Sequence, residues 1–314
     1  MPKKTVFSSP RLFRSILCPI DFSEHSATAL RYAAAIAKRS EAQLHALYVN
    51  DPLLATAAAI ASNDRDIAAV ALRELRTFVA SAVPARAAGG EIECSVETGD
   101  PAKLIASTAQ RLKCDLVAMG TSGLSGLNKL LIGSTTERMI RRTKVPLLAV
   151  PPSGPGAGEK SAPPRSWPGP AIMAPVDLRD QSQRDVRDAA TVARAFGATL
   201  VLVHVVSQFQ PPPWYRADLS AHWRLQVAKA QRHVESLAKA VGRGVTIESR
   251  VLTGSPPDEI AALAAEKRIG LVVMHLRKGP GFFGSRAGSI AAHVLRHAVT
   301  PVLALPDREK GNFQ

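Results

Sequence analysis

The fold of this chain is decided by the stretch Asp115-Leu116-Val117-Ala118-Met119-Gly120-Thr121-Ser122-Gly123 and the nearby Gly133-Ser134-Thr135. Its first part is apolar after the aspartate, as expected for a buried parallel strand whose carboxyl end opens into a ligand crevice. Gly120 and Gly123 lack a Cβ atom where the backbone turns or approaches a ligand, and the second stretch offers free amides at a helix start. The pattern predicts a nucleotide site in which backbone amides hold a polyphosphate.

The same residues have a structural alternative. Ser134 and Glu137 match the S-x-x-E capping box, so the serine would cap a helix from Thr135 to Arg142. Glycines are also common in any loop between a strand and a helix. On this alternative the loop has no ligand.

Three sets of residues resemble the universal stress protein family. The first is Ile16-Leu17-Cys18-Pro19-Ile20-Asp21-Phe22-Ser23, a strand and turn followed by an amphipathic helix through Leu30, Ala33, Ala34 and Ala37. The second is the loop G-x2-G-x9-G-[ST], which resembles the family's ATP-binding signature and is complete here, and the third is the closing strand Val145-Pro146-Leu147-Leu148-Ala149-Val150. The resemblance implies an α/β fold of open, parallel, five-stranded sheets flanked by helices, similar to the adenine-nucleotide alpha-hydrolases, with ATP as the ligand and Mg²⁺ on its phosphates.

The resemblance also implies which residues bind the nucleotide. They are Pro19, Ile20, Asp21, Val49, Met119, Gly120, Gly123, Gly133, Ser134 and Thr135. Asp21 follows the first strand at the carboxyl edge of the sheet, where the resemblance sets it against the ribose or adenine, and the backbone of Val49 against adenine. The alternative is that Asp21 and Ser23 only start the next helix, although one residue can serve both purposes. Val49 is expected to be a sheet-core valine as well.

The chain repeats itself. Pro175-Val176-Asp177 matches Pro19-Ile20-Asp21 at an offset of 156 (175 − 19), and Pro301-Val302-Leu303-Ala304 matches Pro146-Leu147-Leu148-Ala149 at 155 (301 − 146). Short Val, Ile and Leu runs alternate with Ala-rich stretches in both halves, which is typical of βαβ units in a parallel sheet. We therefore expect two tandem copies of one domain, each long enough to bury its own core.

The expected domain organisation follows from this repeat and from a stretch rich in Pro, Gly and Ser. It comprises a basic leader at 1–14, a first domain at 15–151, a linker at 152–170, a second domain at 171–307 and a tail at 308–314. Strands are expected near 15–20, 44–49, 91–97, 115–119 and 145–150, and again near 171–176, 199–205, 245–251, 270–275 and 301–305.

The second half departs from the signature. By the offset of 155, His275 replaces Gly120 and Lys278 replaces Gly123, while Gly288-Ser289 remains and Asp177 keeps the place of Asp21. Side chains there crowd the path of a triphosphate and resist positive φ. Other loop residues offer flexibility and positive charge to a differently placed anion: Gly279, Gly281, Gly284, Arg277, Lys278 and Arg286. We expect a degenerate partner domain that acts in pairing and regulation.

Other residues of the second half were considered for chemistry. His275 and His293 have no His, Cys or carboxylate at a recognisable ligand spacing, so we expect packing or solvent exposure rather than metal binding. Trp214, Tyr215 and Trp223 either cover the second crevice and stack on a base or form local core beneath a long loop, and we favour the core.

Composition limits the partners. Forty Lys plus Arg against 26 Asp plus Glu gives a net charge of +14, which favours anionic ligands. Aromatic residues are 5% of the chain and no RNA-binding signature is present, so specific nucleic-acid binding is not expected. Cys18, Cys94 and Cys114 are typical of buried, reduced thiols, and no apolar stretch predicts a membrane span or a secretory signal. We expect a cytoplasmic protein.

Known catalytic patterns are missing from the sequence. It has no G-x4-G-K-[ST] loop, no H-x-G-H and no S-G-G-x-D-S, and its glycine loop follows the fourth strand rather than the first. Ser122, Ser125 and Lys129 offer no positioned base or nucleophile for phosphoryl transfer. We expect a protein that binds ATP and at most hydrolyses it slowly; the alternatives are a slow ATPase or autokinase, and a scaffold that recruits an acidic partner without nucleotide.

The family resemblance also implies pairing through the last strands. Val145–Val150 and Pro301–Leu305 would then form a pseudo-dimer within one chain, and two chains would be able to associate as a homodimer.

Overall fold

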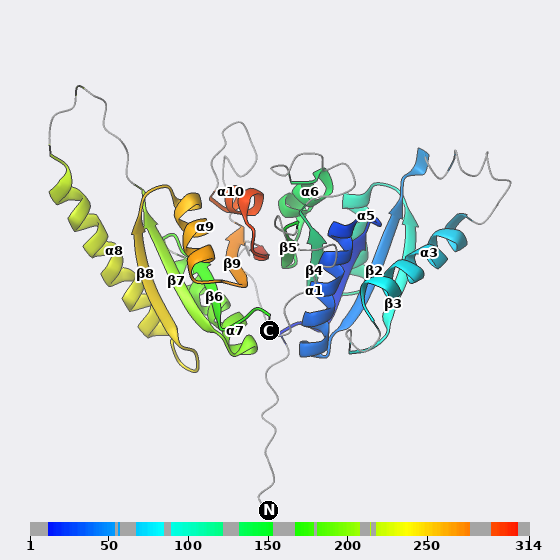
Figure 1. Cartoon of the computed structure of the whole chain (residues 1–314), viewed down its shortest axis with the longest axis horizontal. Helices are drawn as coiled ribbons and strands as arrows, with labels where there is room; N and C mark the ends of the chain where they lie inside the picture. Colours follow the sequence, from blue (N-terminus) through cyan, green and yellow to red (C-terminus); the bar gives the residue numbers. More distant parts are fainter. Residues whose placement is uncertain are drawn as a thin grey trace, which may run out of the picture. The chain divides into compact units, whose positions relative to one another are not determined.

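The structure, a computed structural model, describes residues 12–53, 56, 67–84, 89–121, 132–152, 167–178, 181–207, 214, 218–276 and 290–306. It divides into two compact units, Met1–Pro163 and Pro164–Gln314. Each unit contains one α/β domain (Figure 1), and we describe the two separately.

The first domain is built on a parallel sheet with strand order β3-β2-β1-β4-β5. Its strands are β1 (Ser15–Ile20), β2 (Gln43–Asn50), β3 (Ile92–Thr98), β4 (Leu116–Gly120) and β5 (Leu147–Val150). Its helices are α1 (Glu24–Ser40), α3 (Ile67–Ala82), α5 (Pro101–Arg111) and α6 (Ser134–Arg142). The chain leaves β1 toward β2 on one side and later returns to β4 on the other, which creates a switch point between β1 and β4.

The core of this domain explains why its strands are apolar without alternation. Ile16, Leu17 and Cys18 are consecutive in β1 and all are fully buried. Successive side chains of a strand point to opposite faces, so both faces of the sheet are covered, as in other parallel α/β sheets. The expected apolar face of α1 is confirmed, since Leu30 and Ala33 are fully buried.

The second domain repeats the arrangement with strand order β8-β7-β6-β9-β10. Its strands are β6 (Ala171–Pro175), β7 (Thr199–Val206), β8 (Ile247–Thr253), β9 (Leu271–Leu276) and β10 (Val302–Pro306). Its helices are α7 (Ser182–Phe196), α8 (Ser220–Val241), α9 (Pro256–Glu266) and α10 (Ile290–His297). The predicted fold of two parallel five-stranded sheets is therefore confirmed.

The observed strands overlap the expected ranges, but β5 and β8 each begin two residues later than expected. The last strand of the first domain was expected from residue 145, but β5 begins at Leu147. Pro146 has no N–H to donate to a neighbouring strand, and the N–H of Val145 donates to Oγ1 of Thr143 at 3.1 Å. Val145 and Pro146, which the apolar pattern assigned to the strand, therefore belong to a turn before it.

Left-handed residues end equivalent helices in both domains. Glu41 (φ 52°) follows α1 and Gly197 (φ 64°) follows α7, while Lys113 (φ 51°) and Arg268 (φ 49°) follow α5 and α9. A left-handed residue after a helix lets its N–H bond to a carbonyl of the last turn. These turns belong to the architecture, because they recur whether or not glycine is present.

The two domains anchor their first strands differently. In the first domain, the carboxylate of Asp115 accepts hydrogen bonds from the N–H groups of Arg14 (2.9 and 3.0 Å) and Ser15 (3.1 Å). In the second domain, the indole of buried Trp167 donates to the carbonyl of Gly270 at 2.7 Å. The linker expected at 152–170 lies mostly outside the described residues, but Trp167 packs on the second domain, with its ring 5.7 Å from that of Phe196.

Within the part of the chain that the structure describes, no helix has the length and apolar character that a membrane crossing requires.

Candidate functional site

The candidate site lies at the carboxyl edge of the first sheet. β1 pairs with β2 up to Ile20 opposite Tyr48, and with β4 on its other side, where Leu17 lies opposite Val117. The strands β2 and β4 end at the same edge of the parallel sheet (Figure 1). Asp21 directly follows β1 and therefore lies at this edge, next to the switch point. Open α/β sheets bind their ligands in such a crevice.

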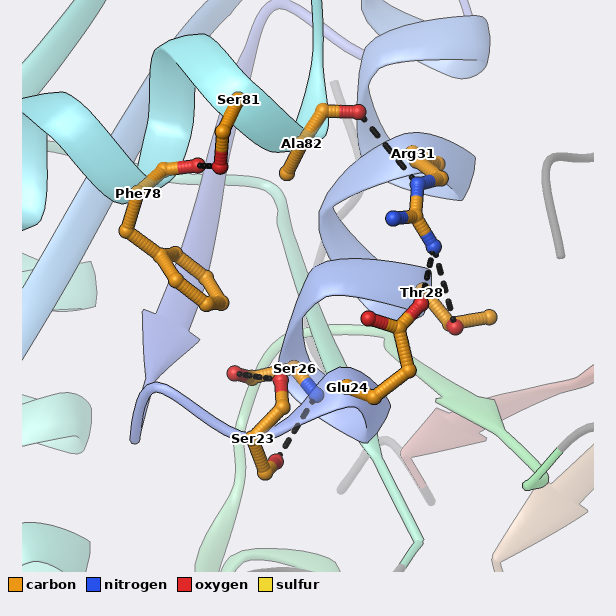
Figure 2. Close-up of polar contacts among 8 residues, drawn as sticks. All are labelled: Ser23, Glu24, Ser26, Thr28, Arg31, Phe78, Ser81 and Ala82. Atoms are coloured by element: carbon orange, nitrogen blue, oxygen red, sulfur yellow. Dashed lines mark hydrogen bonds and ion pairs between the residues drawn. The ribbon is translucent and has the colours of Figure 1, made fainter. Parts of the chain in front are cut away.

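Asp21 is held by a tight turn at this edge. Its Oδ1 accepts hydrogen bonds from the N–H of Ser23 at 3.0 Å and from the hydroxyl of Ser23 at 2.5 Å. The same hydroxyl oxygen accepts from the N–H of Ser26 at 3.1 Å and thereby caps α1 (Figure 2). The expectation that this segment starts a helix is confirmed for Ser23, while Asp21 is tied to the cap through one oxygen only among the described residues.

Phe22, between these two residues, has φ of +62°. A left-handed conformation costs a residue with a side chain about 1–2 kcal/mol. The ring of Phe22 packs edge-on against Tyr48 (centroids 4.7 Å apart) and Phe78 (5.4 Å). Each aromatic pair contributes roughly 0.5–1.5 kcal/mol, so the two contacts together offset the backbone cost.

Arg31 fixes the helix that carries Phe78. Its Nη1 donates to Oε1 of Glu24 at 2.6 Å, and its Nε donates to the carbonyl of Ala82, the last residue of α3, at 3.3 Å. Figure 2 shows the guanidinium reaching from α1 to the end of α3, with Phe78 one turn earlier. A cation at a helix C-terminus is favourable, so Arg31 holds α3, and with it the aromatic ring, beside the turn at Asp21.

The end of β4 is joined to the start of α6. The hydroxyl of Thr136, itself buried, donates to the carbonyl of Gly120 at 2.8 Å, and the N–H of Gly133 donates to the carbonyl of Thr121 at 2.7 Å. The chain therefore leaves this edge at Thr121 and returns beside it at Gly133. Gly123, Ser122, Ser125 and Lys129 lie outside the described residues.

Among the described residues, no side chain caps the N-terminus of α6. The helix begins at Ser134, one residue before the expected start, and its N-cap is Gly133, which makes no side-chain hydrogen bond. The capping-box alternative for Ser134 is therefore wrong, and Glu137 instead pairs with Arg141 at 2.6 Å. The amides of Ser134 and Thr135 lie at the positive end of the helix dipole, at the sheet edge that also carries Asp21.

A second ion pair orients α6. Nη1 of Arg138 lies 2.6 Å from Oδ2 of Asp100, which caps α5 by accepting from the N–H of Lys103 at 2.9 Å. These hydrogen bonds, the backbone one first, lower the pKa of Asp100. Two of the basic residues on α6, Arg138 and Arg141, are thus used within the fold.

The remaining candidate residues are partly covered. Ile20 and Met119 are buried, whereas Pro19, Val49 and Gly120 are half-buried. Val49 is therefore not a fully enclosed core valine. Among the described residues, no group of three or more His, Cys, Asp or Glu side chains has the arrangement of a metal site.

The corresponding edge of the second domain contains a cluster that the sequence did not predict. His275, at the Gly120 position, places Nε2 3.1 Å from Oδ2 of Asp188 and Nδ1 3.5 Å from Oδ1 of Asp185. Both carboxylates come from α7, where their spacing of three residues sets them on one helix face. The expected packing of His275 is consistent with this cluster, but its two carboxylate partners were not predicted, because they are about ninety residues away in sequence.

The remaining expectations for the second domain concern its aromatic residues, its glycine-rich loop and His293. Trp214 is 76% exposed, so the local-core interpretation is wrong for this residue, while Trp223 is half-buried with its ring 5.3 Å from that of His222. The loop at 277–289, the side chain of His293 and the whole of Tyr215 lie outside the described residues.

The cysteines are free thiols. Cys18 and Cys114 are buried as expected, and Cys94 is half-buried. Burial, and next the charge of Asp21, raises the pKa of the Cys18 thiol. Cys18 therefore stays protonated and acts as a small apolar residue beneath the site.

The comparisons with known proteins cover both halves. A family model described as the universal stress protein family matches residues 12–151 and 170–306. A universal stress protein of Methanocaldococcus jannaschii is 33% identical over 146 residues, which is 44% of this chain and 82% of that protein. One of Mycolicibacterium smegmatis is 22% identical over 306 residues, 93% of this chain and 97% of that protein.

Solved structures agree at the level of the fold. The crystal structure of a universal stress protein from Archaeoglobus fulgidus matches with a TM-score of 0.62 at 19% identity, covering 93% of this chain and 96% of that one. Because the family model matches twice and a full-length relative aligns across both halves, this chain belongs to the universal stress protein family, as a tandem member.

Proposed function

We propose that the first domain binds ATP at the carboxyl edge of β1, β2 and β4, and that this binding regulates the protein in a stress response. The phosphates would meet the amides that begin α6 and the loop after Gly120, and the nucleoside would meet Asp21 and Val49. Mg²⁺ would be held through the phosphates rather than by a dedicated set of protein ligands.

One observation carries this proposal: α6 starts directly beside the end of β4, and no side chain among the described residues caps it. An uncapped helix N-terminus at the switch point of a parallel sheet is suited to an anion, because its amides and its dipole favour negative charge. The complete signature in the same domain gives that anion the chemistry of a nucleotide.

We propose binding rather than turnover as the output. Of the acidic groups near the edge, Asp21 has one oxygen engaged by Ser23, and Glu137 is paired with Arg141. In the proposed arrangement Asp21 meets the nucleoside rather than the phosphates, and Glu137 is neutralised by its ion pair, so neither acts as a base beside the phosphates. Any hydrolysis should be slow, and a single-turnover assay with labelled ATP measures it through free or protein-bound phosphate.

The test is calorimetric titration of the full-length protein with ATP and Mg²⁺ after any carried-over nucleotide has been removed. We expect one site per chain. Gly123→Val should remove the heat of binding, because a branched side chain obstructs the path of the phosphates, whereas Lys278→Val, at the equivalent position of the second domain, should not.

Each outcome separates the alternatives. Unchanged ATP affinity in a folded Gly123→Val protein would show that the loop is structural. No binding to the wild-type protein would favour a scaffold for an acidic partner, in keeping with the charge of +14. Two sites per chain would mean that the second loop has been rebuilt to bind nucleotide.

We also propose that the last strands of the two domains pair within the chain, and that whole chains are able to dimerise. Within its own domain each of these strands is outermost, and an exposed apolar edge favours pairing with another strand. Analytical ultracentrifugation combined with NMR relaxation tests this. A monomer whose two halves tumble independently would exclude the internal pairing.

A further inference from the structure

The conformation of Phe22 sets the two domains apart. Among the described residues, four that are not glycine have positive φ: Phe22, Glu41, Lys113 and Arg268. Glu41, Lys113 and Arg268 each follow the C-terminal end of a helix, and each has a left-handed counterpart in the other domain. Phe22 lies within the candidate site, and Leu178, its counterpart at the offset of 156 (178 − 22), is described and is not left-handed.

The left-handed conformation is coupled to the position of Asp21. The turn in which Oδ1 of Asp21 accepts two bonds from Ser23 runs through Phe22, so the backbone at Phe22 determines whether these atoms meet. A strained residue of this kind persists only where its surroundings fix it, and such residues gather at ligand sites. Here the surroundings are the rings of Tyr48 and Phe78.

The second domain lacks these parts. Leu178 replaces Phe22, and His204 replaces Tyr48 at the same offset of 156 (204 − 48). The imidazole of His204 forms its hydrogen bond with the carbonyl of Val176 at 2.8 Å. The aromatic support and the left-handed turn therefore occur together in the first domain and are both missing from the described part of the second.

We propose that Phe22 is a positioning residue that aims the carboxylate of Asp21 at a ribose hydroxyl of the bound nucleotide. With Oδ1 engaged by Ser23, Oδ2 makes no hydrogen bond to the described residues, so it is the oxygen available to a hydroxyl donor. The inference rests on the proposed ATP binding and adds that the site selects ribonucleotides over 2′-deoxyribonucleotides through the turn at Phe22.

The experiment compares the affinities of the full-length protein for ATP and 2′-deoxy-ATP. We expect the wild type to prefer ATP by about tenfold, the order of one hydrogen bond to a charged group. Phe22→Leu, which installs the residue of the second domain, should reduce this preference at least fivefold and leave the affinity for 2′-deoxy-ATP within about twofold of wild type. Leu178→Phe is the matched control and should change neither affinity.

Two further variants separate positioning from folding. Phe22→Gly accepts positive φ without a steric cost, so it provides a folded protein if the leucine variant is unstable. Because it can keep the left-handed turn, it should retain more of the preference for ATP than Phe22→Leu does. In an Asp21→Ala background, Phe22→Leu should have no further effect on the preference, since the carboxylate it positions is missing.

The results distinguish this inference from the proposed function. A wild type that binds both nucleotides equally, or a folded Phe22→Leu protein with unchanged preference, overturns the role of Phe22 but leaves ATP binding in place. An equal loss for both nucleotides in Phe22→Leu also overturns it, because positioning of Asp21 affects only the hydroxyl. A wild type that binds neither nucleotide removes the proposed function and this inference with it.

Discussion

The two domains share a fold and differ at one edge of it. At the end of β4 the first domain has Gly120, whose carbonyl accepts a hydrogen bond from the hydroxyl of Thr136. Thr136 belongs to α6, whose N-terminus is not capped by any described side chain. At the end of β9 the second domain has His275, whose ring lies between Asp185 and Asp188. Strand order and helix-ending turns are repeated, so duplication kept the architecture and changed the chemistry of the crevice.

If the first domain binds ATP as proposed, this difference explains how the second domain keeps the fold without the nucleotide site. At an offset of 156, the positions of Asp185 and Asp188 correspond to Ala29 and Tyr32 of the first domain (185 − 29 and 188 − 32). At these three positions the first domain has the uncharged residues Gly120, Ala29 and Tyr32, whereas the second has a histidine in contact with two carboxylates. The carboxylates oppose a triphosphate through their charge as well as through their bulk.

The largest expected effect comes from exchanging the residues at this corner. Gly120→His should weaken ATP binding about 100-fold, equivalent to about 3 kcal/mol, because the ring occupies the ligand's approach and finds no carboxylate partner. His275→Gly should not create a second site, since Asp185 and Asp188 remain. Calorimetric affinity and stoichiometry measure both variants.

Gly120→Ala serves as the milder control, with an effect smaller than that of histidine. A His275→Gly protein that binds two ATP molecules would contradict the view that the second crevice is closed by charge.

The next effect concerns the anchoring of the first strand in each domain. Gly270→Ala should destabilise the second domain by about 3 kcal/mol, because an added Cβ would overlap the backbone carbonyl of Pro168 and force the chain apart. Asp115→Ala should cost the first domain less, about 1–2 kcal/mol, through lost hydrogen bonds to Arg14 and Ser15. Urea denaturation with separate probes for the two domains measures both.

Equal costs for the two substitutions would contradict the assignment of different anchors. Asp115→Asn retains the shape and one acceptor oxygen, so it should recover part of the stability that alanine loses.

The smallest expected effect is a dependence on pH at equivalent helix starts. Asp100 caps α5 and has a lowered pKa, whereas Ser255, at the start of α9, makes no side-chain capping bond. A carboxylate with a lowered folded pKa stabilises the fold above its unfolded pKa, about 3.9, and loses that contribution as pH falls through the folded value. Asp100→Ala should therefore reduce stability at pH 7 by more than at pH 3.

Ser255→Ala should change stability little at either pH. Thermal melts at the two pH values measure the effect, and a loss from Asp100→Ala that is the same at pH 3 and pH 7 would contradict the role of the ionised cap.

Much of the fold was predictable because its signals are local. Apolar runs, glycines and prolines predicted the strands and their order of appearance. Two strands, β5 and β8, begin two residues later than expected, because the N–H groups of Val145 and Val245 donate to local turns. At the candidate site, the sequence predicted that Asp21 and Gly120 follow strands. It did not predict the left-handed Phe22, because the conformation depends on the rings of Tyr48 and Phe78, which are distant in the chain.

The sequence by itself determined that two similar α/β domains follow one another and that only the first has the complete pattern G-x2-G-x9-G-[ST], since both follow from repeats and spacing within short segments. The tertiary structure decided which side chains meet: His275 with the carboxylates of α7, Asp115 with Ser15, and Trp167 with Gly270. These partners lie about ninety to one hundred residues apart, and only the packing of helices and strands sets the distances and angles on which a hydrogen bond or ion pair depends.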